Sequence, residues 1–166
     1  MKNNQKNIIP VFPGSFDPIH NGHLDLIERS LCLWDSIIIG VLDNPTKKTL
    51  FTAKERVALI RECVRRFGSS RVAVESFSGL LVEFCKKKKC GLVVRGLRAI
   101  SDFDYEAQMA LTNRKLLPGL ETVYLMSSEE HSYVSSTVVK QLIQFGGDVS
   151  KFVPYAIVKA VKNVRK

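Results

Sequence analysis

Two histidines in a glycine-containing segment near the start of the sequence could contact a phosphate. His20 and His23 are three residues apart, so both side chains can face the same side of a first helical turn. Gly14 and Gly22 allow a ligand to approach the backbone closely, and N–H groups at a helix N-terminus attract anions. Either histidine alone could equally be a loop or cap residue, and a zinc ion would need a further ligand that has no clear candidate nearby. The combined pattern favours phosphate binding.

Cationic and hydroxyl side chains recur where later β-rich runs end. Lys47 follows the second run, Arg95 and Arg98 follow the fourth, and Ser135 and Ser136 follow the fifth. Ligands of parallel sheets bind beyond the carboxyl ends of the strands, so we expect these side chains to meet the histidines at one site. The sequence contains neither G-x-x-x-x-G-K-[ST] nor G-x-G-x-x-G, which argues against a P-loop and against the usual dinucleotide site.

The elements that must position these residues follow an alternating pattern of short β-rich runs and longer helical segments. The pattern predicts strands at 8–12, 36–42, 71–76, 92–94 and 122–126, and helices at 22–33, 53–67, 79–89, 102–116, 135–145 and 154–164. Thr52 and Glu55 form a capping box before the second helix, and Gly68 stands where a C-terminal glycine belongs. Such alternation implies right-handed βαβ crossovers. We therefore predict an α/β fold with a doubly wound, five-stranded parallel sheet, helices on both faces and a single domain over residues 1–166.

The composition is that of a folded, positively charged chain. It has 166 residues, of which 45% are hydrophobic, and no apolar run approaches the ~20 residues of a membrane-spanning helix. Residues 1–7 precede an apolar segment that is short and broken by Pro10, which argues against a secretory leader and favours the cytoplasm. The 25 Lys and Arg against 16 Asp and Glu give a net charge of +9, which attracts nucleic acids, phosphorylated metabolites or anionic membranes.

Two conspicuous features have a structural interpretation. The four cysteines, Cys32, Cys63, Cys85 and Cys90, lack C-x-x-C spacing, and we predict buried free thiols. The run at 86–89 consists of four lysines at the end of a helical pattern. Because cations are favourable near a helix C-terminus, a solvated helix end is preferred there over a nucleic-acid patch.

Four blocks of residues carry a resemblance to a known enzyme family. They are PGSFDP (13–18) with HNGH (20–23), PTKK (45–48) with FT (51–52), RGLRA (95–99) with DFDYE (102–106), and VSSTVVK (134–140). In these blocks and in their order the chain resembles bacterial phosphopantetheine adenylyltransferase, a family of the nucleotidyltransferase superfamily with its H-x-G-H motif. The resemblance spans nearly the whole chain and implies a Rossmann-like form of the predicted sheet.

The resemblance implies a reaction between two polyanions. AMP would pass from ATP to 4'-phosphopantetheine by direct in-line attack, giving dephospho-coenzyme A and pyrophosphate, the penultimate step of coenzyme A biosynthesis. Positioning and electrostatic stabilisation then do most of the catalysis, and no protein nucleophile is needed. By the same resemblance Mg²⁺ would be held mainly by the nucleotide rather than by the protein.

Residue roles also follow from the resemblance. His23 would donate a hydrogen bond to the α-phosphate, and Lys47 with Arg95 would hold the attacking phosphate, which makes these three the catalytic residues. Ser15 would bridge the two substrates, and Leu81 would contact the pantetheine arm. The positions that match the family's ATP site are Ser15, Phe16, His23, Gly96, Leu97, Arg98, Glu106, His131, Ser132, Tyr133, Val134, Ser135, Ser136 and Thr137.

The chain departs from the family pattern at three positions. Ser15 replaces a frequent threonine but keeps the hydroxyl, and His20 replaces a frequent threonine, so we assign it no essential role. His131 stands where an aromatic residue commonly lies beside the adenine. The resemblance further implies a homohexamer and feedback binding of coenzyme A, without a nucleic-acid or membrane partner.

Other interpretations of these residues remain open. Arg95 could be a salt-bridged surface residue, Glu106 could support helix pairing near Arg114 and Lys115, and Ser135 and Ser136 could be helix caps. A related nucleotidyltransferase acting on another phosphorylated acceptor would share the histidine block, although the third block speaks against it. A basic nucleic-acid-binding module is the alternative from another class, and the aromatic residues show none of the interleaving it would need.

Overall fold

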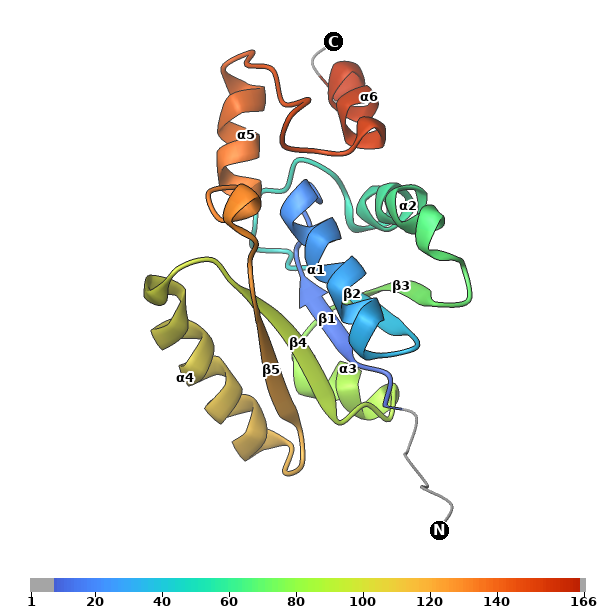
Figure 1. The fold of residues 1–166 in the computed structure, drawn as a ribbon, viewed down its shortest axis with the longest axis vertical. Coiled ribbons are helices and arrows are strands. Elements are labelled where there is room, and N and C mark those ends of the chain that lie inside the picture. The colour runs from blue at the N-terminus through green and yellow to red at the C-terminus, as the bar shows by residue number, and fades with distance from the viewer. Residues whose placement is uncertain (1–7, 165–166) are drawn as a thin grey trace.

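The computed structural model describes residues 8–164, and its centre is a five-stranded parallel sheet (Figure 1). The expectation about a secretory leader in residues 1–7 lies outside this range. The strands are β1 (Val11–Gly14), β2 (Ile37–Leu42), β3 (Val72–Phe77), β4 (Leu92–Leu97) and β5 (Glu121–Met126). Their order across the sheet is β3-β2-β1-β4-β5, and every neighbouring pair is parallel. The chain therefore reverses its direction of winding between β1 and β4, which is where this class of sheet binds ligands.

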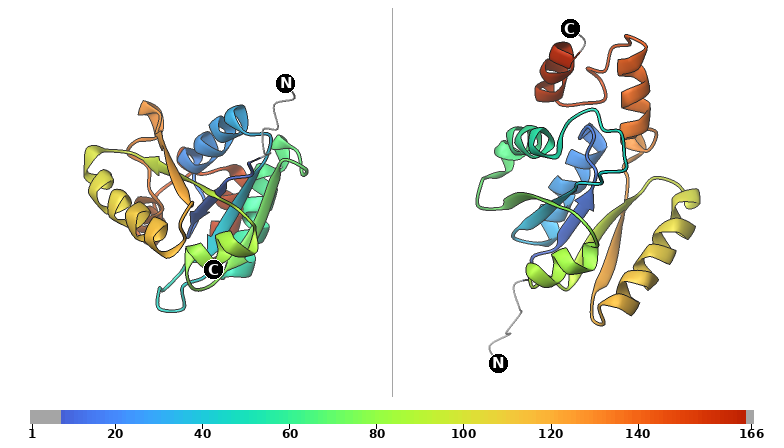
Figure 2. Two further views of the ribbon diagram at one scale, coloured as in Figure 1. Left: turned by 90° about the horizontal axis from the view of Figure 1, so that it is seen from below. Right: turned by 180° about the vertical axis from the view of Figure 1, so that it is seen from behind.

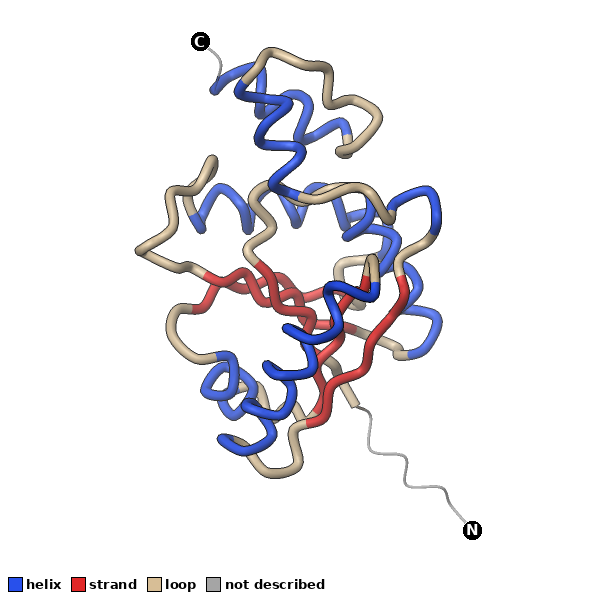
Figure 3. The backbone as a smooth tube through the Cα atoms, turned by 90° about the vertical axis from the view of Figure 1, so that its left-hand side faces the viewer, coloured by secondary structure: helices blue, strands red, loops and turns tan. Residues whose placement is uncertain are grey.

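The helices occupy the segments between and after the strands. They are α1 (Asn21–Leu33), α2 (Ala53–Val64), η1 (Arg65–Phe67), α3 (Leu81–Lys87), α4 (Ile100–Leu116), η2 (Glu129–His131), α5 (Ser136–Gln144) and α6 (Tyr155–Val164). Figures 2 and 3 show helices on both faces of the sheet, with α5 and α6 beyond one end of it. The predicted doubly wound α/β fold is confirmed. Within residues 8–164, none of the helices combines the length and apolar character needed to cross a bilayer.

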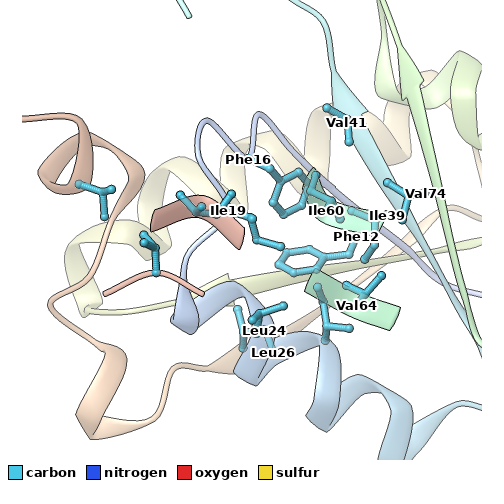
Figure 4. Packing of buried hydrophobic residues seen from close by; sticks show 14 of the residues in the cluster. Phe12, Phe16, Ile19, Leu24, Leu26, Ile39, Val41, Ile60, Val64 and Val74 are labelled. Atoms are coloured by element: carbon cyan, nitrogen blue, oxygen red, sulfur yellow. The ribbon is translucent and has the colours of Figure 1, made fainter. Parts of the chain in front are cut away.

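The core consists of two apolar clusters, one on each face of the sheet. Alternate residues of β1 supply both, because Phe12 lies in the larger cluster and Val11 in the smaller. The larger cluster joins the sheet to α1, α2, α5 and α6, and Figure 4 shows Phe12 among side chains of α1 and α2. The smaller one joins it to α3 through Val82 and Phe84. Because β1 is buried on both faces, its position in the sheet is well defined. The loop that follows β1, which carries Ser15 and leads to His23, therefore starts from a well-defined position.

The boundaries of β1 and β4 differ from the sequence prediction by three residues at one end, whereas those of the other strands differ by no more than one residue. β1 begins at Val11 and continues to Gly14, so Pro13 and Gly14 belong to the strand instead of the loop after it. β4 continues to Leu97, because Arg95, Gly96 and Leu97 stay in register with β5. An arginine followed by glycine suggests a strand end in the sequence, but here the Arg95 guanidinium has partners that compensate its partial burial.

The ends of α2 and α3 are set by a capping box and by residues with positive φ. The Thr52 and Glu55 capping box is present, and α2 passes into a single 3-10 turn before Gly68, whose φ is +92°. The third helix is shorter than predicted and covers Leu81–Lys87, since Gly79 and Lys89 both have positive φ. The thiols of Cys85 and Cys90 are free and buried as predicted. The prediction is wrong for Cys32, which is exposed on α1, and for Cys63, which is only half-buried.

Candidate active site

Two adjoining cavities lie at the carboxyl ends of β1 and β4. The first has a volume of about 490 Å³ and the second about 420 Å³. They share one wall, formed by Pro13, Gly14, Ser15, Arg95, Tyr105 and Glu106. The two cavities therefore adjoin along these residues, and the reacting ends of two bound molecules could approach each other beside them.

The first cavity collects most of the residues that the resemblance assigns to the nucleotide. Among the predicted positions, its lining includes Ser15, Phe16, His23, Arg95, Gly96, Arg98, Glu106, His131, Val134, Ser135 and Ser136. Leu97, Ser132, Tyr133 and Thr137 line neither cavity. Leu97 is buried at the end of β4, and Thr137 is exposed on α5.

The second cavity is more apolar and holds the predicted acceptor residues. Lys47 and Leu81 line it together with Ser15 and Arg95. The rest of its surface includes Phe77, Leu80, Met109 and Asn113. Two cations, Lys47 and Arg95, in a lining that also has a large apolar part suit a ligand with an anionic end and a longer, partly apolar body.

Room for the site arises where β1 and β4 separate. The two strands pair at Val11 with Val93, near the start of both. Further along, the carbonyl oxygen of Pro13 accepts a hydrogen bond of 2.7 Å from Nη1 of Arg95. Beyond Val11 and Val93, this side-chain hydrogen bond of Arg95 connects β4 to β1 in place of a backbone hydrogen bond. Arg95 lines both cavities.

The Arg95 guanidinium is held by Glu106 from α4. Arg95 Nε donates to Glu106 Oε2 at 2.8 Å, and Nη2 pairs with Glu106 Oε1. Glu106 is buried, and the hydroxyl of Tyr124 donates to its carbonyl oxygen at 2.8 Å. Arg114 pairs with Glu121 instead, so the interpretation of Glu106 as a partner in helix pairing near Arg114 and Lys115 is wrong. Arg95 is indeed salt-bridged, but at a cavity wall and not at an open surface.

His23 is oriented by the backbone at the start of α1. The N–H of His20 donates to Nδ1 of His23 at 3.2 Å. Because Nδ1 accepts, the proton of the neutral ring must be on Nε2, which leaves one N–H donor for a ligand. The ring also contacts Phe16 edge to face at 4.9 Å between centroids and stacks on His20 at 3.6 Å. These contacts define both the tautomer and the position of the imidazole.

Both histidines are held in the neutral form. Burial lowers the pKa of His23 well below its ordinary value, and His20, Arg95 and Arg98 lower it further. Burial likewise lowers the pKa of His20 to about 3, with smaller contributions from Arg98 and His131. Near neutral pH these rings therefore act as uncharged hydrogen-bonding groups, while the positive charge of the site comes from arginine and lysine.

The depressed histidine pKa values make stability depend on pH. Below pH 6.5 the unfolded chain binds protons that buried His20 and His23 reject, so the free energy of unfolding falls as the pH drops toward 3. Each ring contributes a slope of about 1.4 kcal/mol per pH unit in this window. We expect His20→Gln to flatten the slope between pH 6 and 5 by about that amount, measured by urea unfolding. An unchanged slope in the variant would contradict this.

Arg98, Ser135 and Ser136 of the first cavity already have protein partners. Arg98 Nε and Nη2 each donate to Asp102 at 3.1 Å, and the Arg98 hydrogen bond lowers the pKa of that carboxyl. The Ser135 hydroxyl caps α5 by accepting from the N–H of Val138 at 3.2 Å, and the Ser136 hydroxyl donates to the carbonyl of Pro18 at 2.9 Å. The cap interpretation of Ser135 is thus confirmed, and it leaves the first N–H groups of α5 as the means of anion binding there.

Several residues of the site were missed or left without a role in the sequence analysis. Asn113, Tyr105 and Asp102 line the cavities, and His20 supports His23. The H-x-G-H spacing could have indicated His20, since Gly22 is the residue that makes room for its ring: an added Cβ would lie 3.2 Å from it. The other three lie on α4, in a segment whose periodicity gives no sign of which face meets a ligand.

Comparison with known proteins identifies the family of this chain. Residues 11–142 match the family model described as cytidylyltransferase-like. The phosphopantetheine adenylyltransferase of Clostridium kluyveri is 52% identical over 161 residues, covering 92% of this chain and 97% of that protein. The one from Alkaliphilus metalliredigens is 48% identical over 155 residues, covering 93% and 98%. The chain belongs to the cytidylyltransferase-like family and, within it, to the phosphopantetheine adenylyltransferases.

Solved structures of more distant proteins share the fold. A bifunctional NMN adenylyltransferase/ADP ribose pyrophosphatase from Francisella tularensis superposes with a TM-score of 0.70 at 17% identity, over 89% of this chain and 45% of that one. A lipopolysaccharide core biosynthesis protein from Thermoplasma volcanium gives a TM-score of 0.52 at 23% identity, over 73% of this chain and 96% of that one. The resemblance and the Rossmann-like sheet predicted from the sequence are both confirmed.

Proposed function

We propose that the chain transfers AMP from ATP to 4'-phosphopantetheine, with ATP in the first cavity and the acceptor in the second. The observation that carries this proposal is the wall of Ser15 and Arg95 that the two cavities share. Group transfer needs two ligands side by side with their reacting ends in contact, and this wall is where such ends would meet. Membership among the phosphopantetheine adenylyltransferases supports ATP and 4'-phosphopantetheine as the two ligands.

The lining of each cavity favours this assignment of substrates. The N-terminus of α5, Arg98 and His23 give the first cavity the donors that a triphosphate requires. His131 lies on the same wall and offers an imidazole face for the adenine. In the second cavity, Lys47 suits the acceptor phosphate and Leu81 suits the partly apolar arm.

The chemical step needs no covalent enzyme intermediate. A phosphate oxygen of the acceptor attacks the α-phosphorus of ATP, the new P–O bond forms, and the bond to the β-phosphate oxygen breaks as pyrophosphate leaves. The Nε2–H of His23 would donate to the α-phosphate, where negative charge accumulates in the transition state. Because the ring is neutral and already oriented, it does not have to reorganise during the reaction.

Arg95 retains donors for the attacking phosphate. Its guanidinium has five N–H groups, and the contacts to Glu106 and Pro13 use three of its nitrogens once each. One N–H on Nη1 and one on Nη2 are left to donate to a phosphate. Arg95 can therefore stay bonded to Glu106 and hold a phosphate at the same time.

Both carboxylates that line the cavities are already paired with arginine side chains. Asp102 is paired with Arg98 and Glu106 with Arg95, and within residues 8–164 no cluster of three metal-binding side chains occurs. Mg²⁺ prefers several oxygen ligands, frequently from phosphates. We propose that the triphosphate brings the ion with it, and no step of the mechanism above is assigned to it.

A two-substrate assay tests the proposal. The purified chain with ATP, 4'-phosphopantetheine and Mg²⁺ should release pyrophosphate and form dephospho-coenzyme A, and neither substrate alone should give product. The alternative of another phosphorylated acceptor is tested with two further substrate pairs: nicotinamide mononucleotide with ATP, and a phospho-alcohol with CTP. Turnover with one of these, and none with 4'-phosphopantetheine, would overturn the proposed acceptor.

Assembly, location and regulation follow from the same resemblance as further proposals. We propose a homohexamer in the cytoplasm that binds coenzyme A as a feedback ligand and has no nucleic-acid or membrane partner. Coenzyme A carries the acceptor's own pantetheine arm, so it would compete for the second cavity. Light scattering of the purified chain measures the assembly, and inhibition by coenzyme A that excess 4'-phosphopantetheine relieves would support the shared cavity.

Lys47 is expected to act mainly on the acceptor. It lines the second cavity only and lies on the exposed segment between β2 and α2. We expect Lys47→Ala to raise the KM for 4'-phosphopantetheine on the order of tenfold or more, because one charge-assisted contact to a phosphate is lost. The affinity for ATP should stay within about threefold of the wild type. An unchanged acceptor KM, measured at saturating ATP, would count against this role.

A further inference from the structure

A fully buried arginine lies behind the active site, outside both cavities. Arg56, in the second turn of α2, is 1% exposed. Its Nη1 donates to the carbonyl oxygens of Ser15 at 2.6 Å and Leu42 at 2.9 Å. Its Nε donates to the carbonyl oxygen of Phe51 at 3.1 Å, and Nη2 pairs with Asp43 at 3.4 Å. One side chain thus joins three separate stretches of backbone.

These stretches of backbone flank or contain two residues of the candidate active site, Lys47 and Ser15. Leu42 and Asp43 precede the segment that carries Lys47, and Phe51 follows it. Ser15 forms part of the wall between the two cavities. The guanidinium therefore binds both ends of the Lys47 segment and connects them directly to Ser15.

Asp17 reinforces the same connection from the other side. Its carboxylate accepts the N–H of Leu50 at 2.9 Å and that of Phe51 at 3.0 Å. Asp17 is 2% exposed and belongs to the same loop as Ser15. The loop after β1 and the Lys47 segment are thus linked through both a buried cation and a buried anion.

The presence of an arginine at this buried position is not explained by a contribution to the stability of the core. A buried charge is costly to desolvate, and an apolar side chain of similar volume commonly stabilises a core as well or better. The one carboxylate it touches, Asp43, has a side chain that is 54% exposed and compensates the charge only weakly. What a guanidinium provides and an apolar side chain lacks is several donors in a rigid plane.

We propose that Arg56 is a positioning residue for the transfer reaction. It fixes the Lys47 segment relative to Ser15, and so fixes the acceptor phosphate in the second cavity relative to ATP in the first. This inference rests on the proposed function, since it concerns the same two substrates. Arg56 touches neither cavity and acts only through the backbone that it holds.

Kinetics of Arg56→Lys test the inference, with Arg61→Lys as the matched control. Lysine keeps the charge but cannot span three carbonyls. Arg61 is on the same helix and donates to the carbonyl of Val74 at 2.9 Å, away from the cavities. We expect Arg56→Lys to lower kcat/KM for the acceptor roughly 10- to 100-fold, because misplacement by about 1 Å has effects of that order. ATP affinity, measured by calorimetry without acceptor, should change less than threefold, and Arg61→Lys should match the wild type.

A double variant separates positioning from general destabilisation. If Arg56 acts by placing Lys47, then Arg56→Lys should cost much less in a Lys47→Ala background than in the wild type. Equal losses in both backgrounds, or a loss of ATP affinity as large as the loss of kcat/KM, would overturn the inference. An inactive wild-type chain would instead refute the proposed function itself, and that is read from the parallel wild-type assay.

A second variant decides the question if the Arg56 variants do not fold. Asp43→Ala removes a half-exposed partner of Arg56 and leaves the core intact. We expect it to raise the acceptor KM roughly twofold to fivefold with ATP affinity unchanged, as the loss of a partly exposed ion pair implies. An unchanged acceptor KM would overturn the inference in that case.

Discussion

Replacing His23 with alanine is expected to lower kcat about 100- to 1,000-fold while the Kd for ATP changes less than threefold. Removing one preoriented donor from a site of developing charge has effects of this size on turnover. The donor is the Nε2–H of a neutral ring, because Nδ1 accepts the N–H of His20. The ground-state phosphate has other donors in the first cavity, so ATP binding depends little on this one. Single-turnover kinetics and calorimetry with ATP alone give the two quantities.

The same variant distinguishes a transition-state role from a binding role. Equal losses in ATP affinity and in turnover would show that His23 contributes to ground-state binding only. His23 also contacts Phe16, whose backbone has a φ of +47°, so the unfolding curve of the variant has to be measured as a control. A variant that unfolds at the same urea concentration as the wild type and still loses turnover establishes the catalytic effect.

The sequence predicted the site through residues whose partners are close along the chain. His23 follows a strand and opens a helix, and Ser135 caps a helix four residues before a buried valine. Such local patterns determine local structure directly, because the groups that interact are three or four positions apart. The order of alternating strands and helices then determined where these local sites meet, since parallel strands end at one edge of the sheet.

Residues that act across the chain could not be predicted in this way. Arg56 binds carbonyl groups 14 and 41 positions away, and any residue type can present a carbonyl. Asp17 binds backbone N–H groups 33 and 34 positions away, which again leave no pattern in the sequence. Arg95 was predicted to be a loop residue for the same reason: what keeps it in β4 is a carbonyl of β1 and a carboxylate of α4.

The arrangement around Arg95 also suggests a second role for Glu106, besides the nucleotide contact that the resemblance implies. The resemblance places Glu106 among the nucleotide contacts, and it does line the first cavity. Its two carboxylate oxygens, however, are both used by Arg95. We propose that Glu106 acts on the substrates largely by orienting the Arg95 guanidinium, and because Arg95 lines both cavities, this effect would extend to both ligands.

Replacing Glu106 with alanine is accordingly expected to lower kcat/KM for ATP and for the acceptor together, by about 100-fold each. Without the carboxylate the guanidinium keeps only its bond to Pro13 and can turn away from the shared wall. The variant should also lose about 1–3 kcal/mol of stability, since a partly buried cation is left without its partner. Initial rates with each substrate varied in turn, together with urea unfolding, measure both effects.

Glu121→Ala provides the matched control, because Glu121 pairs with Arg114 where both side chains are 55% exposed. An exposed pair contributes about 1 kcal/mol or less, so this variant should keep wild-type kinetics. Glu106→Asp, which retains the charge with a shorter reach, should recover part of the loss for both substrates. If Glu106→Ala impaired ATP alone and left the acceptor KM unchanged, the carboxylate would act on the nucleotide directly, and Arg95 would hold its position through Pro13 and the strand.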